Sequence, residues 1–175
     1  MIAEKIKSTV RDVQDFPKPG ILFKDITPLL VDFRVRRQIV KALAVEARKL
    51  KIDAIIGIES RGFLFGISLA DELNVPFVPV RKAGKLPFTK NKIEYELEYG
   101  TAEIEIHTDA LVKGSRVLIH DDLLATGGTA VAAAQLVKSI GGDVAGFGFI
   151  IELSDLKGRE KLLKYNTNII SLATY

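Results

Sequence analysis

Uninterrupted apolar runs and helix-spaced apolar residues alternate along most of the chain. The uninterrupted runs predict strands at residues 54–58, 76–80, 116–120 and 144–151. Helical spacing predicts helices at residues 2–13, 32–50, 62–73 and 130–140. Asp32 is the expected N-cap of the second helix. Alternation of this kind builds βαβ units, so we expect an α/β fold with a doubly wound, mainly parallel sheet.

The pattern is interrupted between Gly84 and Gly100, where lysines and glutamates crowd a segment with little apolar periodicity. A loop of this length inside a compact domain is usually functional, such as an active-site lid, or disordered. Beyond it, residues 102–107 alternate apolar and polar, as expected for a half-exposed strand.

Composition narrows the function classes. With 175 residues and no repeats or linker-like tracts, the chain is expected to form a single domain over residues 1–175. It has no cysteine, which excludes disulfides and thiolate chemistry. No apolar run approaches the ~20 residues that span a bilayer, and the first twelve residues lack a signal-peptide core, so a cytoplasmic protein without membrane contact is expected. A net charge of +3 is too small to indicate nucleic-acid binding.

The most informative stretch is VLIHDDLLATGGT, residues 117–129. It begins as a buried strand and ends in a helix, and Gly127 and Gly128 allow the backbone to approach a ligand closely. The N–H groups of Thr126, Gly127, Gly128 and Thr129 can converge on an anion at the start of the helix, with two threonine hydroxyls as further donors. We therefore interpret residues 125–129 as a phosphate site built without a lysine.

Two adjacent carboxylates, Asp121 and Asp122, precede this phosphate site. The carboxyl ends of strands in an open α/β sheet are where ligands bind. Carboxylates there could coordinate Mg²⁺ or accept hydrogen bonds from the vicinal hydroxyls of a ribose. Either reading suits a sugar phosphate.

Two other nucleotide-binding motifs fail on inspection. Residues 57–62 have the G-x-x-x-x-G spacing of a P-loop but lack the lysine and hydroxyl residue that must follow. Gly146 and Gly148 begin a dinucleotide fingerprint that has no third glycine.

The stretch at residues 117–129 resembles the phosphoribosyl pyrophosphate motif of the type I phosphoribosyltransferases. The likeness to the adenine-specific branch of that family extends over about residues 16–153. Three further motifs stand in the family's order: the hood FPKPGILFKDI (16–26), the pyrophosphate loop ESRGFLFG (59–66), and a flexible catalytic loop that runs from Arg81 to LEYG (97–100). The resemblance implies a small N-terminal hood over about residues 1–30 and a flexible loop over about residues 82–100.

The resemblance also assigns roles to individual residues. The 5-phosphate would bind at Ala125, Thr126, Gly127, Gly128 and Thr129, and the ribose at Asp121 and Asp122. The diphosphate would meet Ser60, Arg61, Arg81, Lys82 and Lys85, after a non-proline cis peptide between Glu59 and Ser60. Adenine would stack on Phe23 and be read by the main chain of Leu22 and Lys24. Arg61, Arg81 and the general acid/base Glu98 would be the catalytic residues, and only the resemblance singles out Glu98.

The activity implied is purine salvage, in which adenine and phosphoribosyl pyrophosphate give AMP and pyrophosphate. Mg²⁺ would be bound by the substrate, with at most a water-mediated contact to Asp121, since it favours phosphate and water ligands. A homodimer is implied because Arg81 or its neighbours reach the adjoining subunit in the family. Two alternatives remain: transfer to a 6-oxopurine, and a regulator that senses phosphoribosyl pyrophosphate without catalysis.

Two positions depart from the family's pattern. Lys24 stands where arginine is common, although a main-chain contact to the base would survive the change. His120 replaces an aliphatic residue. It is either a core histidine with satisfied hydrogen bonds, which we favour, or a group that tunes Asp121.

Overall fold

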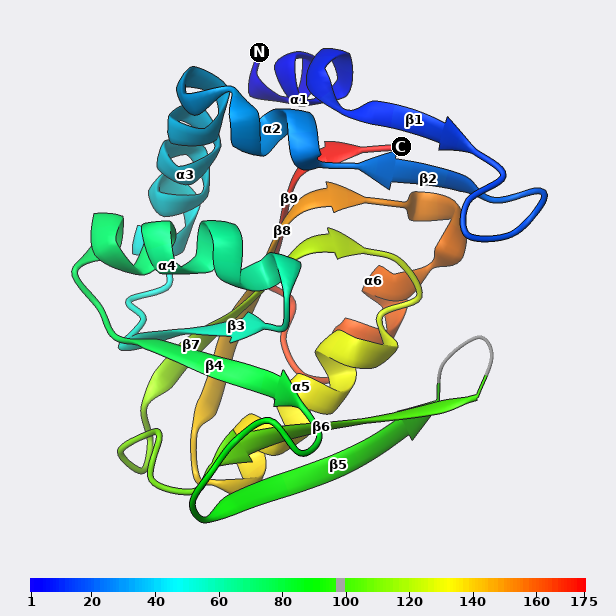
Figure 1. The fold of residues 1–175 in the computed structure, drawn as a ribbon. Helices are drawn as coiled ribbons and strands as arrows, with labels where there is room; N and C mark the ends of the chain where they lie inside the picture. Colours follow the sequence, from blue (N-terminus) through cyan, green and yellow to red (C-terminus); the bar gives the residue numbers. More distant parts are fainter. Residues whose placement is uncertain (97–99) are drawn as a thin grey trace.

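A seven-stranded sheet forms the centre of the protein, in a computed structural model that describes residues 1–96 and 100–175 (Figure 1). The strand order is β5-β6-β4-β3-β7-β8-β9. The strands are β3 (Ala54–Ile58), β4 (Phe77–Lys82), β5 (Lys90–Glu96), β6 (Thr101–His107), β7 (Arg116–Leu124), β8 (Asp143–Glu152) and β9 (Ile169–Thr174). Five adjacent strands run parallel, namely β4, β3, β7, β8 and β9. Strands β5 and β6 are antiparallel to each other at one edge, and β6 is antiparallel to β4.

Helices cover both faces of this sheet, which confirms the predicted doubly wound α/β fold. They are α1 (Ile2–Thr9), α2 (Thr27–Val31), α3 (Phe33–Arg48), α4 (Arg61–Leu73), α5 (Gly128–Ser139), the short 3₁₀ helix η1 (Ser154–Leu156) and α6 (Gly158–Leu162). Helices α1 to α4 pack on one face, and α5 and α6 on the other. Asp32 caps α3 as predicted, accepting hydrogen bonds from the N–H groups of Arg34 and Val35. Within the described ranges, no helix is long and apolar enough to cross a bilayer.

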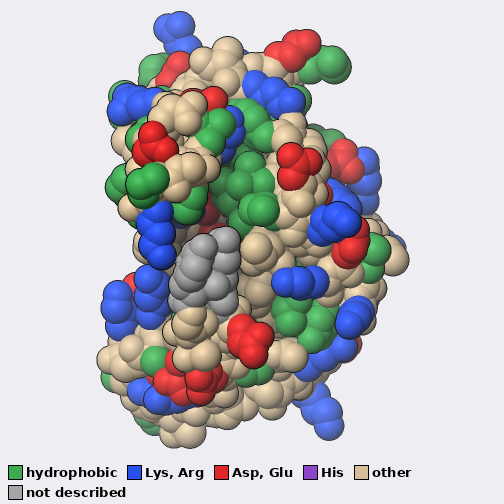
Figure 2. Space-filling model, turned by 90° about the vertical axis from the view of Figure 1, so that its right-hand side faces the viewer, with side chains coloured by type: hydrophobic (Ala, Val, Ile, Leu, Met, Phe, Trp, Pro, Cys, Tyr) green, Lys and Arg blue, Asp and Glu red, His purple; other side chains and the backbone are tan. Residues whose placement is uncertain are grey.

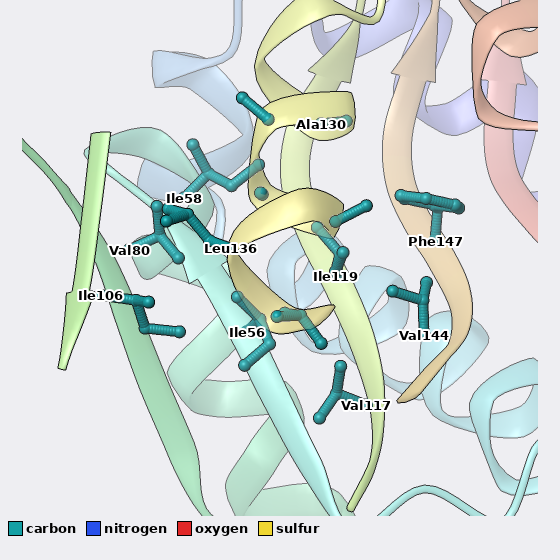
Figure 3. Packing of buried hydrophobic residues seen from close by; sticks show 14 of the residues in the cluster. Ile56, Ile58, Val80, Ile106, Val117, Ile119, Ala130, Leu136, Val144 and Phe147 are labelled. Carbon is teal, nitrogen blue, oxygen red and sulfur yellow. The ribbon is translucent and has the colours of Figure 1, made fainter. Parts of the chain in front are cut away.

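Figure 3 shows the core between α5 and the sheet. Side chains from β3 and β7, such as Ile56 and Ile119, point toward Leu136 on α5 and are fully or almost fully buried. Burial on both faces explains why these strands read as continuous apolar runs. The core thereby fixes the carboxyl ends of β3 and β7 beside each other.

The N-terminal segment forms a small two-stranded sheet above the body, with β1 (Arg11–Gln14) antiparallel to β2 (Leu22–Asp25). The prediction of one helix over residues 2–13 was wrong at its end. Val10 adopts an extended backbone, the helix stops at Thr9, and the next residues pair with β2. Pairing between strands outweighed helical spacing here.

The segment predicted to be an irregular loop contains strand β5, which pairs with β6 along its length. Ile93 and Tyr95 face the helix side and pack against the core, whereas Glu94 and Glu96 are exposed. The alternation was present in the sequence but was obscured by the surrounding charges. The strand β6 also differs from a half-exposed strand, because Glu105 in its middle is fully buried.

Candidate active site

Two pockets open at the carboxyl edge of the parallel strands, and they meet at Asp121. The first is lined by the loop that joins β7 to α5, and the second by the turn between β3 and α4 together with Lys82 from β4. Figure 2 shows a hollow in one face of the molecule, with Lys and Arg side chains along its left side in that view. The residues expected to bind the 5-phosphate and the ribose therefore line pockets at the same edge of the sheet as Ser60, Arg61 and Lys82.

The first pocket contains the five predicted phosphate residues, 125–129. Gly127 has a left-handed backbone (φ +78°) and forms the N-cap of α5. A Cβ atom at Gly127 would lie 2.7 Å from the carbonyl oxygen of Gly158, so only glycine fits. The first N–H groups of a helix have no partner within it, and those of α5 line this pocket. The geometry suits a phosphate at the helix N-terminus.

The two carboxylates occupy the junction between the pockets. Asp121 is half-buried and accepts a hydrogen bond from the N–H of Asp122 (2.9 Å). Asp122 is 2% exposed, and its Oδ2 lies 3.0 Å from Nε of Arg61 as an ion pair. Burial raises the pKa of both carboxyls, and the charge of Asp122 raises the pKa of Asp121 further. Hydroxyl donors or a cation from a ligand would stabilise their ionised forms.

A divalent cation has two carboxylates available at this junction. No group of three or more acidic or histidine side chains that could hold a metal occurs in residues 1–96 and 100–175. This donor set fits Mg²⁺ that keeps most of its ligands from substrate phosphates and water.

The turn after β3 carries Ser60 and Arg61 into the second pocket. The peptide bond between Glu59 and Ser60 is cis, as the resemblance implied. Gly62 lets the first turn of α4 approach β7, because a Cβ atom there would lie 3.1 Å from Oδ1 of Asp121. Arg61 is thus held beside the carboxylate pair, with its guanidinium able to offer a planar pair of donors to a diphosphate.

Three of the predicted diphosphate cations, Arg81, Lys82 and Lys85, lie at the end of β4 or just after it. Arg81 and Lys85 are ion-paired to Glu59. Nε of Arg81 is 3.0 Å from one carboxylate oxygen of Glu59, and Nζ of Lys85 is 2.6 Å from the other. The N–H of Lys82 donates to the same carboxylate (2.8 Å). Burial alone would raise the pKa of Glu59, but these three donors outweigh it and lower the pKa to about 2. The Glu59 side chain is therefore ionised, and it holds the side chains of Arg81 and Lys85 beside the pocket.

The hood brings Phe23 to the same region. Its ring lies 5.0 Å from the ring of Phe16, edge to face, and 5.5 Å from the guanidinium carbon of Arg61. Leu22 is exposed, whereas the side chain of Lys24 is buried, donating to Asp12 at 2.7 Å and lying 4.0 Å from the ring of Tyr175. Among the described residues, strand β2 pairs with β1 along one edge and with no strand along the other, which leaves the main-chain groups of that edge outside the sheet ladder. This arrangement agrees with a main-chain role for Leu22 and Lys24.

The remaining predicted residue, Glu98, lies outside the described residues, as do its neighbours Leu97 and Tyr99. Its position therefore stays a prediction.

Comparisons of the sequence and the fold with known proteins show the family to which the chain belongs. A model of the phosphoribosyl transferase domain matches residues 30–173. An adenine phosphoribosyltransferase from Cytophaga hutchinsonii is 52% identical over 175 residues, which cover 100% of this chain and 97% of that protein. The crystal structure of adenine phosphoribosyltransferase from Thermoanaerobacter pseudethanolicus superimposes with a TM-score of 0.95 at 53% identity and covers 99% of both chains. The chain belongs to the adenine phosphoribosyltransferase family.

A more distant member of the adenine phosphoribosyltransferase family, from Saccharomyces cerevisiae, was crystallised with adenine and an imino-altritol bisphosphate. It is 42% identical, with a TM-score of 0.92 and 98% of each chain covered. Family membership confirms the resemblance drawn from the motifs.

In this family member, three residues to which sequence reasoning gave no side-chain role shape the site. Glu59 was noted only as part of the pyrophosphate loop motif and of its cis peptide, and its carboxylate binds the basic side chains. Buried Glu105 accepts hydrogen bonds from the N–H groups of Lys85 and Leu86 and so shapes the start of the predicted catalytic loop. Gly158 packs against the phosphate loop from 30 residues further along the chain, and no sequence signal marks it.

His120 is a buried core residue whose Nδ1 donates to the carbonyl of Gly148 (2.8 Å). Its Nε2 has no hydrogen-bond partner in the described structure. Burial lowers its pKa to about 4, so the ring is neutral at pH 7. The favoured reading as a core histidine is correct, except that only one ring nitrogen is satisfied.

Proposed function

We propose that this protein transfers the 5-phosphoribosyl group of phosphoribosyl pyrophosphate to N9 of adenine, which gives AMP and pyrophosphate. The observation that carries the proposal is the meeting of two anion-binding pockets at Asp121. A ribose with a phosphate at C5 and a diphosphate at C1 needs one pocket for each anionic group. Between these pockets it needs acceptors for the ribose hydroxyls, and the two carboxylates lie there.

The 5-phosphate binds at residues 125–129, where the N–H groups of the first turn of α5 converge. Asp121 and Asp122 accept hydrogen bonds from the ribose hydroxyls. The proposed contacts place the anomeric carbon toward the turn after β3.

The diphosphate binds at Ser60, Arg61 and Lys82, with Arg81 and Lys85 close by on Glu59. In the reaction the bond between C1 and the diphosphate oxygen breaks, and the bonding electrons leave with the diphosphate. The cationic side chains stabilise the charge that develops on this leaving group. Mg²⁺ brought by the substrate would supply further positive charge there, and Asp121 would hold it at most through a water molecule.

Adenine is proposed to stack on Phe23, with the free edge of β2 at Leu22 and Lys24 reading its ring nitrogens and amino group. The lone pair of N9 forms the new bond to C1, and the imidazole ring then loses one proton. Glu98 is proposed to accept it.

We also propose a homodimer and a cytoplasmic location. Apolar side chains are exposed on α3 and on α4, with Phe33 at 57%, Leu64 at 44% and Ile67 at 53% exposure. Leu64 and Ile67 lie one turn apart on the same face of α4. An exposed apolar face of this kind suits contact with a second copy.

The proposal is tested by measuring pyrophosphate release with Mg²⁺ and phosphoribosyl pyrophosphate in the presence of adenine, hypoxanthine, guanine, xanthine or uracil. Turnover with adenine alone is expected. Turnover with an oxopurine would overturn the assignment of the hood as the selector of adenine. Binding of phosphoribosyl pyrophosphate without turnover on any base would favour a sensing protein instead.

A further inference from the structure

The hydroxyl group of Tyr95, at the end of β5, reaches the phosphate loop. Oγ1 of Thr129 donates to it at 3.3 Å. No motif marked Tyr95, because it lies in the charged segment that was expected to be an irregular loop. We infer, on the basis of the proposed function, that Tyr95 is a positioning residue of the 5-phosphate subsite, whose hydroxyl orients the Thr129 hydroxyl toward the bound phosphate and links β5 to the phosphate loop.

Packing holds Tyr95 in place independently of this hydrogen bond. Its ring is half-buried and packs, with Ile93, against the apolar cluster under α5. A Cβ atom built on Gly128 would lie 3.8 Å from the Tyr95 ring and 3.2 Å from the carbonyl oxygen of Glu96. The last two residues of β5 therefore lie directly against the first turn of α5, and a side chain at Gly128 would push them away.

The two hydroxyls carry two protons, and one of them is used in the bond between Thr129 and Tyr95. Thr129 lines the phosphate pocket. If the Tyr95 hydroxyl turns to donate to Oγ1 of Thr129, the proton of Thr129 is free for a phosphate oxygen, and hydrogen bonds to charged acceptors are stronger than neutral ones. In a phosphate site without a lysine, this donor contributes a larger share of the binding energy.

The same contact links phosphate binding to the predicted catalytic loop. Tyr95 stands three positions before Glu98 in the sequence. A phosphate that engages the hydroxyl pair stabilises the end of β5, from which the segment with Glu98 continues. Removal of the hydroxyl should therefore weaken ligands that carry the 5-phosphate and leave pyrophosphate, in the other pocket, unaffected.

The test compares Tyr95→Phe, which keeps the ring and removes only the hydroxyl, with Tyr165→Phe. Tyr165 packs on the same apolar cluster, whereas the hydroxyl bonded to Thr129 is that of Tyr95. Calorimetric titration with AMP should show a dissociation constant raised roughly tenfold or more for Tyr95→Phe and unchanged for Tyr165→Phe. Thr129→Val should cause a similar loss, and the double variant should lose much less than the product of the two factors.

In the reverse reaction, the KM for AMP should rise in Tyr95→Phe while the KM for pyrophosphate stays constant. Equal AMP binding by Tyr95→Phe and the wild type would overturn the inference. So would equal losses for AMP and pyrophosphate accompanied by a lower melting temperature, since a merely structural hydroxyl gives that result. A wild type that binds no AMP would instead overturn the proposed function itself.

Discussion

His120 provides a pH-dependent test of how this core is built. The ring lies fully buried between β7 and α4, and burial lowers its pKa from 6.5 to about 4. Between these two values the unfolded chain binds a proton that the folded protein excludes. Stability should therefore rise with pH through this window and be lost as the pH falls below 6.5.

The magnitude follows from the two pKa values. Keeping the ring neutral lowers the free energy of unfolding by about 0.2 kcal/mol at pH 7, about 2 kcal/mol at pH 5 and about 3 kcal/mol at pH 4. His120→Leu removes this dependence, because leucine does not titrate. It also leaves the carbonyl of Gly148 without its donor, which should cost about 1 kcal/mol at every pH.

The assay is urea unfolding of the wild type and His120→Leu at pH 7, 6 and 5, at one fixed protein concentration. Other titrating groups affect both proteins alike and cancel in the difference. The wild type should be more stable than the variant at pH 7, and this difference should shift by about 2 kcal/mol in favour of the variant at pH 5. Parallel pH curves for the wild type and His120→Leu would refute the reasoning.

Two further substitutions test the residues that support the site. Glu59→Gln removes the anion that holds Arg81 and Lys85, so urea unfolding at pH 7 should show a loss of about 2–3 kcal/mol. Because the pKa of Glu59 is lowered to about 2, this loss should shrink once the pH falls below 4.5, and an unchanged midpoint at pH 7 would contradict the ion-pair account. Gly158→Ala places a Cβ atom in close contact with the carbonyl oxygen of Ala125, so the KM for phosphoribosyl pyrophosphate should rise at least tenfold. Gly114→Ala is the control for general backbone strain, since Gly114 has φ +83° but a Cβ there meets no atom within 4 Å, and equal KM values for the two variants would argue against a shaped phosphate loop.

The strands and helices that form the core around the central sheet could be predicted from the sequence, because their burial gives a clear apolar pattern. The run at residues 54–58 became β3 with its expected bounds, and Asp32 capped α3 as expected. Strand β7 was longer than its apolar run, since it continues through Asp121 and Asp122 to Leu124. The carboxylates interrupt the apolar pattern, but pairing with β8 carries the strand past them.

Elements that depend on a partner elsewhere in the chain were predicted less well. The helix expected over residues 2–13 stopped at Thr9, because residues 11–14 pair with β2, and β5 was obscured by charged residues that face solvent. Glu105 was expected on an exposed face because its neighbours alternate. It is buried instead, because the N–H groups of Lys85 and Leu86 satisfy its carboxylate and keep its pKa low against the opposing effect of burial.

The same distinction separates the residues of the site. The phosphate loop follows one strand directly, and the turn with Ser60 and Arg61 follows the adjacent strand, so short motifs revealed both. The residues that hold those motifs in place are selected only by the three-dimensional packing. Gly158 fits against residue 127 from the far end of β8, and its neighbour Arg159 is fixed by two hydrogen bonds to the carboxylate of Glu152 at 2.8 and 2.5 Å. A short motif can thus identify the phosphate site, whereas the shape of that site also depends on contacts from distant parts of the chain.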